Sequence, residues 1–269
     1  MSPKALDLIE IALVTLTGYA CHLYYNLIGH IASLRGVDAG PHLLTAVDRA
    51  IPYMPFWVNF YQLAYFMPGV VLALVFARIG LDVPAVRRIL VAFLSLLFAH
   101  YGLYLAVPAS AAAVRLPDAA LGAGTLGGLV RYQYALATIW CAWPSLHVSA
   151  CWFFFRLLAT HYRRLRWIYL GWFVGMVVGT AAIKIHYVLD AATGLVLGEC
   201  AFRFVLAPLT RRNALARRSG SQPRRILVHL AVLVFLLAFL RAGMRMSGVP
   251  WPALHDRVQL PDSDLRYSR

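Results

Sequence analysis

Two short polar stretches interrupt the apolar runs of this sequence, and each contains a histidine. Residues 141–150 read CAWPSLHVSA and place His147 where a long apolar run begins. Residues 183–194 read IKIHYVLDAATG and place His186 inside another such run. An imidazole at such a position can serve as a nucleophile, a general base or a metal ligand. Because ionisable groups in membrane-type runs are costly, both histidines are candidates for a functional site.

Two charged residues accompany His186. Asp190 follows it by four positions, a spacing that stacks two side chains on one face of a helix. Its carboxylate can then accept the Nδ1 hydrogen and leave Nε2 as the basic nitrogen, which suits a nucleophile or a general base. Lys184 precedes the histidine by two positions, and of the 25 Lys and Arg residues only Lys4 and Lys184 are lysines. A lysine beside this histidine is therefore an unusual choice that indicates a role in the site.

The composition indicates an integral membrane protein. Of the 269 residues, 61% are hydrophobic and only 13% are charged, which is far from the balance of soluble domains. The net charge of +14 does not indicate nucleic-acid binding, because the basic residues fall in short connections between apolar runs. The four cysteines form no C-x-x-C pair, so neither a disulfide framework nor a thiolate metal site is expected.

The apolar runs predict seven membrane spans. About 20 apolar residues cross the hydrocarbon core, and we expect a kink in the second span at Pro68. The spans divide the chain into a first span with its outer loop (1–50), a membrane core that carries both histidines (51–207), and a basic loop, last span and polar tail (208–269). The predicted spans are residues 8–32, 55–77, 89–107, 145–160, 167–185, 187–207 and 225–243.

The arginines set the orientation of these spans. They gather in the connections after the second, fourth and sixth spans, and connections of this kind face the cytoplasm. The N-terminus is then cytoplasmic, and the connections 33–54 and 108–143 face outward. The first suits an interfacial turn or a short surface helix, whereas the second is the longest connection in the chain.

The same topology brings the two histidines to one depth. From His147 to the basic turn at Arg163 the chain runs about 24 Å as a helix, and from Arg166 back to His186 it runs about 30 Å. The hydrocarbon core is about 30 Å thick. One helical hairpin therefore returns the second histidine to the outer face, where the first histidine lies.

Together the two stretches resemble the second and third motifs of the type 2 phosphatidic acid phosphatase superfamily. Those motifs read Pro-Ser-Gly-His and Ser-Arg-x5-His-x3-Asp, although Pro-Ser alone is also typical of a helix N-cap. The resemblance covers about residues 50–205 and implies an all-α, polytopic membrane helical bundle with a six-helix phosphatase-like core plus one additional C-terminal span. The corresponding residues here are Pro144, Ser145, Leu146 and His147, and then Gly179, Thr180, His186 and Asp190.

The sequence departs from the family pattern in its phosphate-binding residues. The first family motif, Lys-x6-Arg-Pro, lacks its lysine, because Pro108 stands seven places before Arg115 and Leu116 follows that arginine. Thr180 replaces the arginine of the third motif, and Lys184 can supply the missing charge. The resemblance implies that a phosphate is bound by Ser145, Leu146, Lys184, Arg115 and Thr180.

The resemblance also implies a reaction through a phosphohistidine, without a metal or another cofactor. His186 would attack a lipid phosphate, Asp190 would orient its ring, and His147 would protonate the leaving oxygen and then activate an alcohol or water. Leu146 and residues 186–190, which read HYVLD, are more similar to one branch of the superfamily than to its standard lipid phosphatases. That branch includes inositol phosphorylceramide synthase and its bacterial relatives. The expected partners are a lipid-phosphate substrate and membrane lipids, at a bacterial inner membrane with the site facing outward.

Three alternatives stay open from the sequence. His147, His186 and Asp190 could be the ligands of a metal-dependent membrane hydrolase, because two histidines and a carboxylate can bind zinc or iron. A non-enzymatic lipid transporter would place its site at the bilayer midplane between repeats, and the sequence contains no repeat. A Ser145–His protease is weaker, because no G-x-S-x-G frame surrounds the serine.

Overall fold

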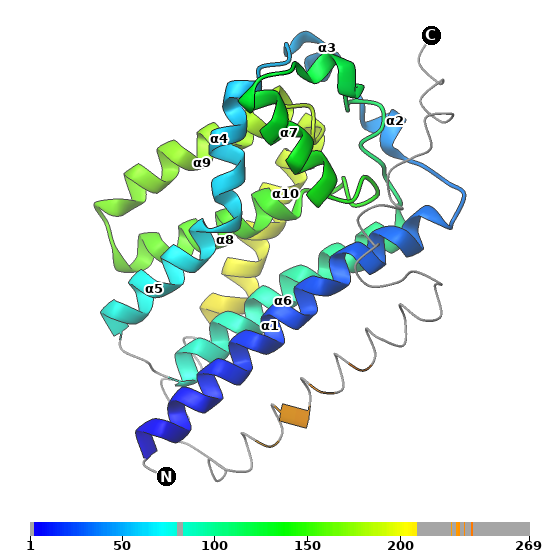
Figure 1. Cartoon of the computed structure of the whole chain (residues 1–269). Helices are drawn as coiled ribbons and strands as arrows, with labels where there is room; N and C mark the ends of the chain where they lie inside the picture. Colours follow the sequence, from blue (N-terminus) through cyan, green and yellow to red (C-terminus); the bar gives the residue numbers. More distant parts are fainter. Residues whose placement is uncertain are drawn as a thin grey trace.

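The computed structural model describes residues 3–79 and 83–208, together with a few single positions further along the chain. Within this part, the regular structure consists of helices (Figure 1), which confirms the predicted all-helical class. Apart from those single positions, the predicted seventh span (225–243) lies outside the described residues, as does most of the predicted C-terminal unit (208–269).

The six remaining predicted spans correspond to helices, either singly or as consecutive pieces. Their observed ends differ from the predicted ends by a few residues, which is the usual uncertainty of boundaries read from a pattern. The helices are α1 (Pro3–Ser33); η1 (Pro55–Trp57), α4 (Val58–Gln62), η2 (Leu63–Tyr65) and α5 (Met67–Ile79); α6 (Val83–Ala106); α8 (Leu146–His161); α9 (Leu165–Ala182); and α10 (Val188–Cys200) with the π-helical η4 (Ala201–Leu206).

Two helices of the described part are long and apolar enough to cross a membrane, namely Pro84–Ala106 and Leu165–Ala182. A third span is obtained if the bent pair Pro55–Tyr65 and Met67–Arg78 is counted as one. These candidate spans identify an integral membrane protein. The predicted six-helix core with an added C-terminal span goes beyond these two or three candidates and stays a prediction.

The second predicted span is bent, but the bend precedes Pro68. The two parts of the span meet at an angle of 43°, and the break lies at Phe66, between η2 and α5. Pro68 is the second residue of α5, where its missing N–H has no intrahelical acceptor in any case. The proline therefore begins a new helix after the break and does not kink a continuous one.

Both predicted outer connections contain short helices. The connection 33–54 folds into α2 (Gly40–Leu43) and α3 (Ala46–Ala50), as predicted for a short surface helix. The long connection carries η3 (Asp118–Leu121) and α7 (Thr125–Leu136). Buried Gly127, Val130 and Gln133 lie at three-residue intervals along α7, so this helix packs one face on the bundle.

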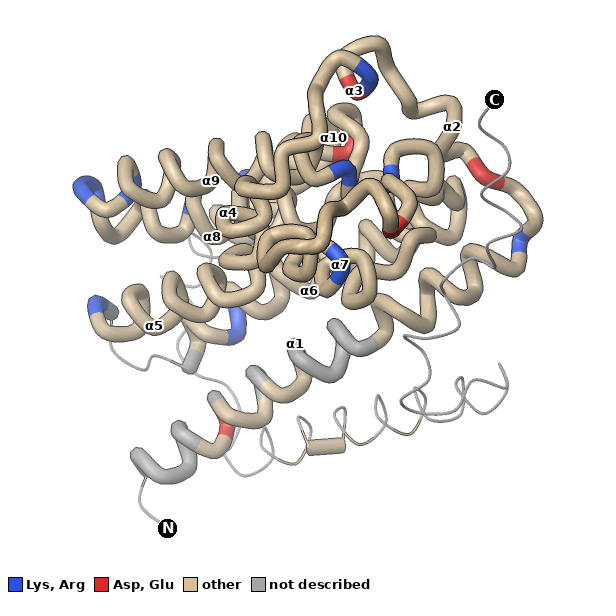
Figure 2. The backbone as a smooth tube through the Cα atoms, turned by 45° about the horizontal axis from the view of Figure 1, so that its top comes forward, with Lys and Arg blue, Asp and Glu red and all other residues tan. Residues whose placement is uncertain are grey.

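The bundle has two distinguishable ends. The helix α1 lies along α6, and α8 packs against α5, α9 and α10 (Figure 1). The basic residues at the end of α5 and between α8 and α9 lie at one end (Figure 2). The opposite end holds the N-termini of α8 and α10, together with α2 and α3 (Figure 1). We call this opposite end the histidine end, because both motif histidines lie there.

Two glycines let α8 and α10 approach closely. A Cβ atom placed on Gly194 would lie 2.6 Å from the carbonyl oxygen of Ser145, and one on Gly198 would lie 2.5 Å from that of Ser149. Small residues four apart allow such backbone contact between membrane helices. The contact fixes the start of α8, and with it the Pro-Ser-Leu-His motif, against the middle of α10.

Candidate functional site

The Pro-Ser-Leu-His motif forms the N-terminus of α8. Ser145 is the N-cap residue, and its buried hydroxyl oxygen accepts a hydrogen bond from the Val148 N–H at 3.4 Å. Leu146 and His147 then form the first turn, whose N–H groups have no intrahelical carbonyl to bind. A helix N-terminus of this kind favours an anion, so the motif both begins the helix and points its positive end at the site.

His186 lies in a turn between two helices. Helix α9 ends at Ala182 and α10 begins at Val188. The N–H groups of Ile185 and His186 both donate to the carbonyl oxygen of Thr180, at 3.1 and 3.2 Å. The Thr180 hydroxyl donates to the carbonyl of the preceding helical turn at 2.7 Å and is fully buried. Thr180 therefore acts on the turn through its backbone.

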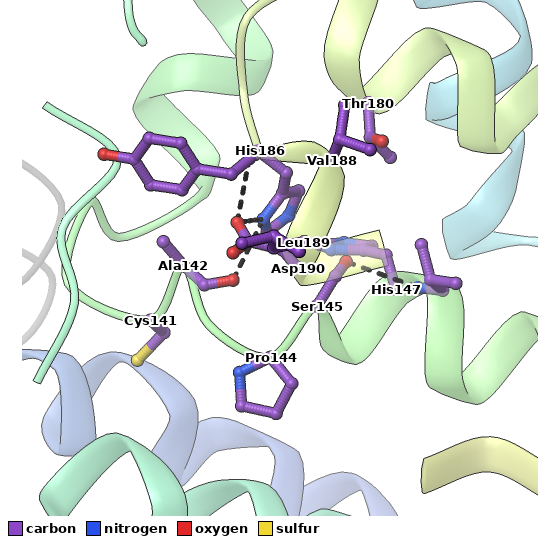
Figure 3. Close-up of polar contacts among 12 residues, drawn as sticks. Cys141, Ala142, Pro144, Ser145, His147, Thr180, His186, Val188, Leu189 and Asp190 are labelled. Atoms are coloured by element: carbon purple, nitrogen blue, oxygen red, sulfur yellow. Dashed lines mark hydrogen bonds and ion pairs between the residues drawn. The ribbon is translucent and has the colours of Figure 1, made fainter. Parts of the chain in front are cut away.

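The predicted contact between His186 and Asp190 is present, but its geometry is that of a helix cap. Asp190 lies in the first turn of α10, and its Oδ2 accepts the Tyr187 N–H at 2.9 Å in a capping box. The same oxygen lies 3.3 Å from His186 Nδ1. His186 precedes α10, so the prediction that His186 and Asp190 share one helical face is wrong. The predicted contact between the two side chains is nevertheless present (Figure 3).

The neighbours of His186 Nδ1 determine where its hydrogen lies. Besides the Asp190 carboxylate, the carbonyl oxygen of Ala142 lies 3.1 Å from Nδ1 (Figure 3). Both neighbours are acceptors, so Nδ1 carries the hydrogen and the lone pair of the neutral ring is on Nε2. The two motifs also bind each other directly, since the Ser145 N–H donates to the Asp190 carbonyl at 3.1 Å. The structure therefore holds a histidine whose Nε2 can act as a base or nucleophile.

His147 lies beside His186, with ring centroids 6.1 Å apart. Its Nδ1 lies 3.2 Å from the hydroxyl of Tyr61, a completely buried residue of α4. The ring of Tyr65 meets the His147 ring edge-on with a centroid distance of 5.1 Å. The two imidazoles are therefore close enough for one phosphoryl group to contact both, although one comes from a helix and the other from a turn.

Arg115 lies in the connection before η3 and is half-buried. Its guanidinium donates to the carbonyl oxygens of Tyr134 and Ala137, at 3.1 and 3.0 Å, and stacks over the Tyr134 ring. Burial lowers the pKa of this guanidinium, while the phenols of Tyr134, Tyr25, Tyr61 and Tyr65 raise it. Arg115 is thus held by the end of α7 and places its charge near the two tyrosines that border His147.

Lys184 points toward the outer connection. Its ammonium donates to the carbonyl oxygens of Asp48 and Ile51, at 2.7 and 2.5 Å. Burial lowers the pKa of the ammonium, and the charge of Asp48 raises it. Because an ammonium has three donors, Lys184 can still bind a third acceptor. The predicted phosphate-binding residues are therefore not gathered around one point: Ser145 and Leu146 adjoin the histidines, whereas Lys184 and Thr180 make their contacts with the backbone.

Two further residues of the site do not follow from the motifs. Tyr61 contacts His147 across 86 positions of sequence, and no spacing pattern indicates it. Asp48 accepts the Val188 N–H at 2.8 Å at the start of α10. The spacing of Thr45 and Asp48 does predict a capping box for α3, and that cap is present. That spacing indicates only where α3 begins, and it does not predict the contact of Asp48 with Val188.

Comparison with known proteins identifies one family. A family model described as the PAP2 superfamily matches residues 36–204, which is more than half of the chain. No curated protein and no solved structure matches this sequence. Among the residues that the structure describes, no three His, Cys, Asp or Glu side chains gather in a group that could hold a metal ion.

Proposed function

The chain belongs to the PAP2 superfamily, and on that premise we propose that it cleaves a lipid phosphate ester through a phosphohistidine at His186. Membership of the family indicates a phosphatase or phosphotransferase that acts on phosphate esters. The observation that carries the proposal is the pair of imidazoles 6.1 Å apart, one of which has its Nδ1 against a buried carboxylate. An enzyme that attacks phosphorus with one histidine and moves a proton with the other needs this arrangement.

In the first half of the reaction, Nε2 of His186 attacks the phosphorus atom and the ester P–O bond breaks. The Nδ1–H group of His186 keeps its hydrogen bonds to the Asp190 carboxylate and the Ala142 carbonyl. These oxygens stabilise the positive charge that develops on the ring. His147 gives a proton to the leaving oxygen as a general acid. The products of this step are a phosphohistidine and a free lipid alcohol.

In the second half, His147 accepts a proton from water or from an alcohol, whose oxygen attacks the phosphorus. The N–P bond breaks and His186 returns to its neutral form. His147 lies in the first turn of α8, with its ring centroid 6.1 Å from that of His186, so the same nitrogen can serve both oxygens in turn.

The phosphoryl oxygens are held by the start of α8. The Ser145 oxygen accepts from Val148, so its hydroxyl hydrogen can be donated to a phosphate. The positive end of the helix adds to this. Arg115 and Lys184 contribute positive potential from the two outer connections, and preorganised donors of this kind stabilise developing charge strongly where water is scarce.

The acceptor in our proposal is an alcohol. Leu146 in place of glycine and the residues HYVLD (186–190) resemble the branch with inositol phosphorylceramide synthase. We therefore favour a phosphotransferase over a phosphatase, with inositol, a sugar or the hydroxyl of another lipid as the acceptor. We propose that the site faces the outer side of a bacterial inner membrane, because the basic residues at the end of α5 and between α8 and α9 lie at the end away from the histidines (Figure 2).

One experiment tests the reaction and its acceptor. The purified full-length protein is incubated with radiolabelled phospholipids, with and without inositol or other alcohols, and the products are separated. We expect an acid-labile, alkali-stable phosphoprotein in the wild type and none in His186→Ala. A phosphorylated alcohol identifies a transferase, and free phosphate alone identifies a phosphatase. If EDTA abolishes turnover and no phosphoprotein forms, a metal-dependent hydrolase is favoured. If neither a phosphorylated alcohol nor free phosphate is produced, a lipid transporter is favoured.

A further inference from the structure

The turn that carries His186 contains a residue in an unfavourable conformation. Lys184 has a φ of 59°, in the left-handed region that side chains other than glycine seldom adopt. Such a conformation persists only where the surrounding structure enforces it. The contacts of this turn should therefore show what enforces it.

Three ties join the turn to residues 45–54, which we call the α3 segment. The first is the pair of hydrogen bonds from the Lys184 ammonium to the Asp48 and Ile51 carbonyls. The second runs from the Val188 N–H to Asp48 Oδ1, at 2.8 Å. The third runs from the Met54 N–H to the Ala182 carbonyl, at 3.0 Å.

These ties are reciprocal helix caps. Val188 is the first residue of α10, so its N–H lacks an intrahelical partner, and the Asp48 carboxylate supplies one. In return, the Lys184 ammonium binds carbonyls at and beyond the last turn of α3, as basic side chains do at helix C-termini. The other carboxylate oxygen of Asp48 accepts from the N–H and hydroxyl of Thr45, at 2.8 and 2.6 Å, so Asp48 itself is fixed.

The three ties to the α3 segment lie on both sides of His186 in the sequence, so they can fix the backbone that carries this histidine. They act at positions 182, 184 and 188, on both sides of the histidine, while the imidazole itself contacts Ala142 and Asp190. We propose that the α3 segment sets the position of His186, with Asp48 and Lys184 as positioning residues. This proposal deepens the proposed function and rests on it for its kinetic consequence, but it makes a structural claim of its own.

The proposal separates two roles of Lys184. If the ammonium chiefly binds the phosphate, its removal weakens the binding of substrate and of anionic inhibitors, and Asp48 is irrelevant. If it chiefly holds the turn, its removal slows phosphoryl transfer with little change in KM. Removal of the Asp48 carboxylate should then produce the same defect, because both side chains maintain the same interface.

The test compares Asp48→Ala, Lys184→Met and the double variant in the full-length protein. We expect each single change to lower kcat about 10- to 100-fold with KM and vanadate inhibition within about twofold. The double variant should be no slower than the slower single variant, because residues that act as one unit are not additive. Asp48→Asn keeps an oxygen for the Val188 N–H but loses the acceptor for the Thr45 N–H, so it should recover part of the activity lost in Asp48→Ala. Asp118→Ala, which removes an exposed outer carboxylate paired with Arg131, is the matched control.

A second measurement does not depend on activity. Hydrogen–deuterium exchange of peptides covering residues 183–190 should rise in Asp48→Ala and Lys184→Met but not in Asp118→Ala. Faster exchange in a protein that never forms a phosphohistidine would support the positioning role and refute the proposed reaction. Unchanged exchange and unchanged kcat in an active enzyme would overturn the positioning role, as would a loss of vanadate inhibition confined to Lys184→Met.

Discussion

The two histidines of the candidate site are held in different ways. His186 is only 4% exposed, lies outside any helix, and has polar contacts on its ring and on both sides of its turn. His147 is half-buried and belongs to the first turn of α8. Its ring packs against the aromatic rings of Tyr61 and Tyr65. A polar network thus fixes one imidazole, whereas a helix end and aromatic packing hold the other.

This difference fits the two chemical roles. A nucleophile must keep one nitrogen aligned with the phosphorus, and small displacements are costly to the rate. A group that moves protons must reach the leaving oxygen and then the attacking oxygen, so it benefits from a less rigid support. We therefore assign the nucleophile to His186 and proton transfer to His147, and the following changes test that assignment in order of expected effect.

The largest effect should come from the comparison of His186→Ala with His147→Ala. Removal of the nucleophile should abolish phosphoprotein and lower turnover by about 10⁴-fold or more. Removal of the proton donor should cost about 10²- to 10⁴-fold, yet still allow phosphoprotein to form from p-nitrophenyl phosphate, whose leaving group needs no proton. Phosphoprotein in His186→Ala but not in His147→Ala would reverse the two roles.

Asp190→Asn should have the next largest effect. The amide oxygen can still accept the Tyr187 N–H, so the start of α10 is preserved, but the anionic partner of His186 Nδ1 is lost. Without it the ring loses both its fixed tautomer and the stabilisation of its cation, and we expect kcat to fall about 10³-fold. The thermal unfolding midpoint, measured in the same detergent, should change little. Retention of more than about a tenth of wild-type kcat would contradict the orienting role.

The part of the site that the sequence could predict depends on local rules. Helix rise and bilayer thickness place His147 and His186 at one end of a hairpin, and the structure places them there. The four-residue spacing predicts the contact with Asp190, although the cap that produces it depends on where α9 ends. These features need only the residues between positions 141 and 194.

The part that the sequence could not predict depends on how distant segments dock. Lys184 was expected at the phosphate, but the α3 segment offers its carbonyls to the ammonium. Tyr61 reaches His147 because the bent second span passes the start of α8, and no periodicity contains that information. The bend at Phe66 likewise follows from a helix break before Pro68 and not from the proline itself.

Gly194→Ala should move one histidine relative to the other. The new Cβ atom would lie 2.6 Å from the Ser145 carbonyl, so the start of α8 must shift away from α10. We expect a fall in kcat of about 10- to 100-fold, since a shift of about 1 Å can cost a factor of about 100. Gly171→Ala is the matched control, because nothing lies within 4 Å of its Cβ position. That control should be neutral or stabilising by up to about 1 kcal/mol in thermal unfolding. Equal effects of the two substitutions would show that the helix contact does not set the site.

Tyr61→Phe should have the smallest effect and the most selective one. The change removes the hydroxyl 3.2 Å from His147 Nδ1 and keeps the ring, so the helix packing is preserved. The loss of the part-buried hydrogen bond to His147 corresponds to about 1 kcal/mol, or a factor of about five to ten in rate. If Tyr61 orients His147 for proton transfer, turnover of an alkyl phosphate should fall by that factor, while turnover of p-nitrophenyl phosphate should stay near the wild-type rate. Tyr169→Phe removes another buried phenol, which donates to the Cys151 carbonyl at 3.1 Å within the same bundle, and should affect neither substrate selectively. An equal loss of turnover on both substrates would mean that Tyr61 only supports packing. The different supports of His186 and His147 would then not explain their different chemical roles.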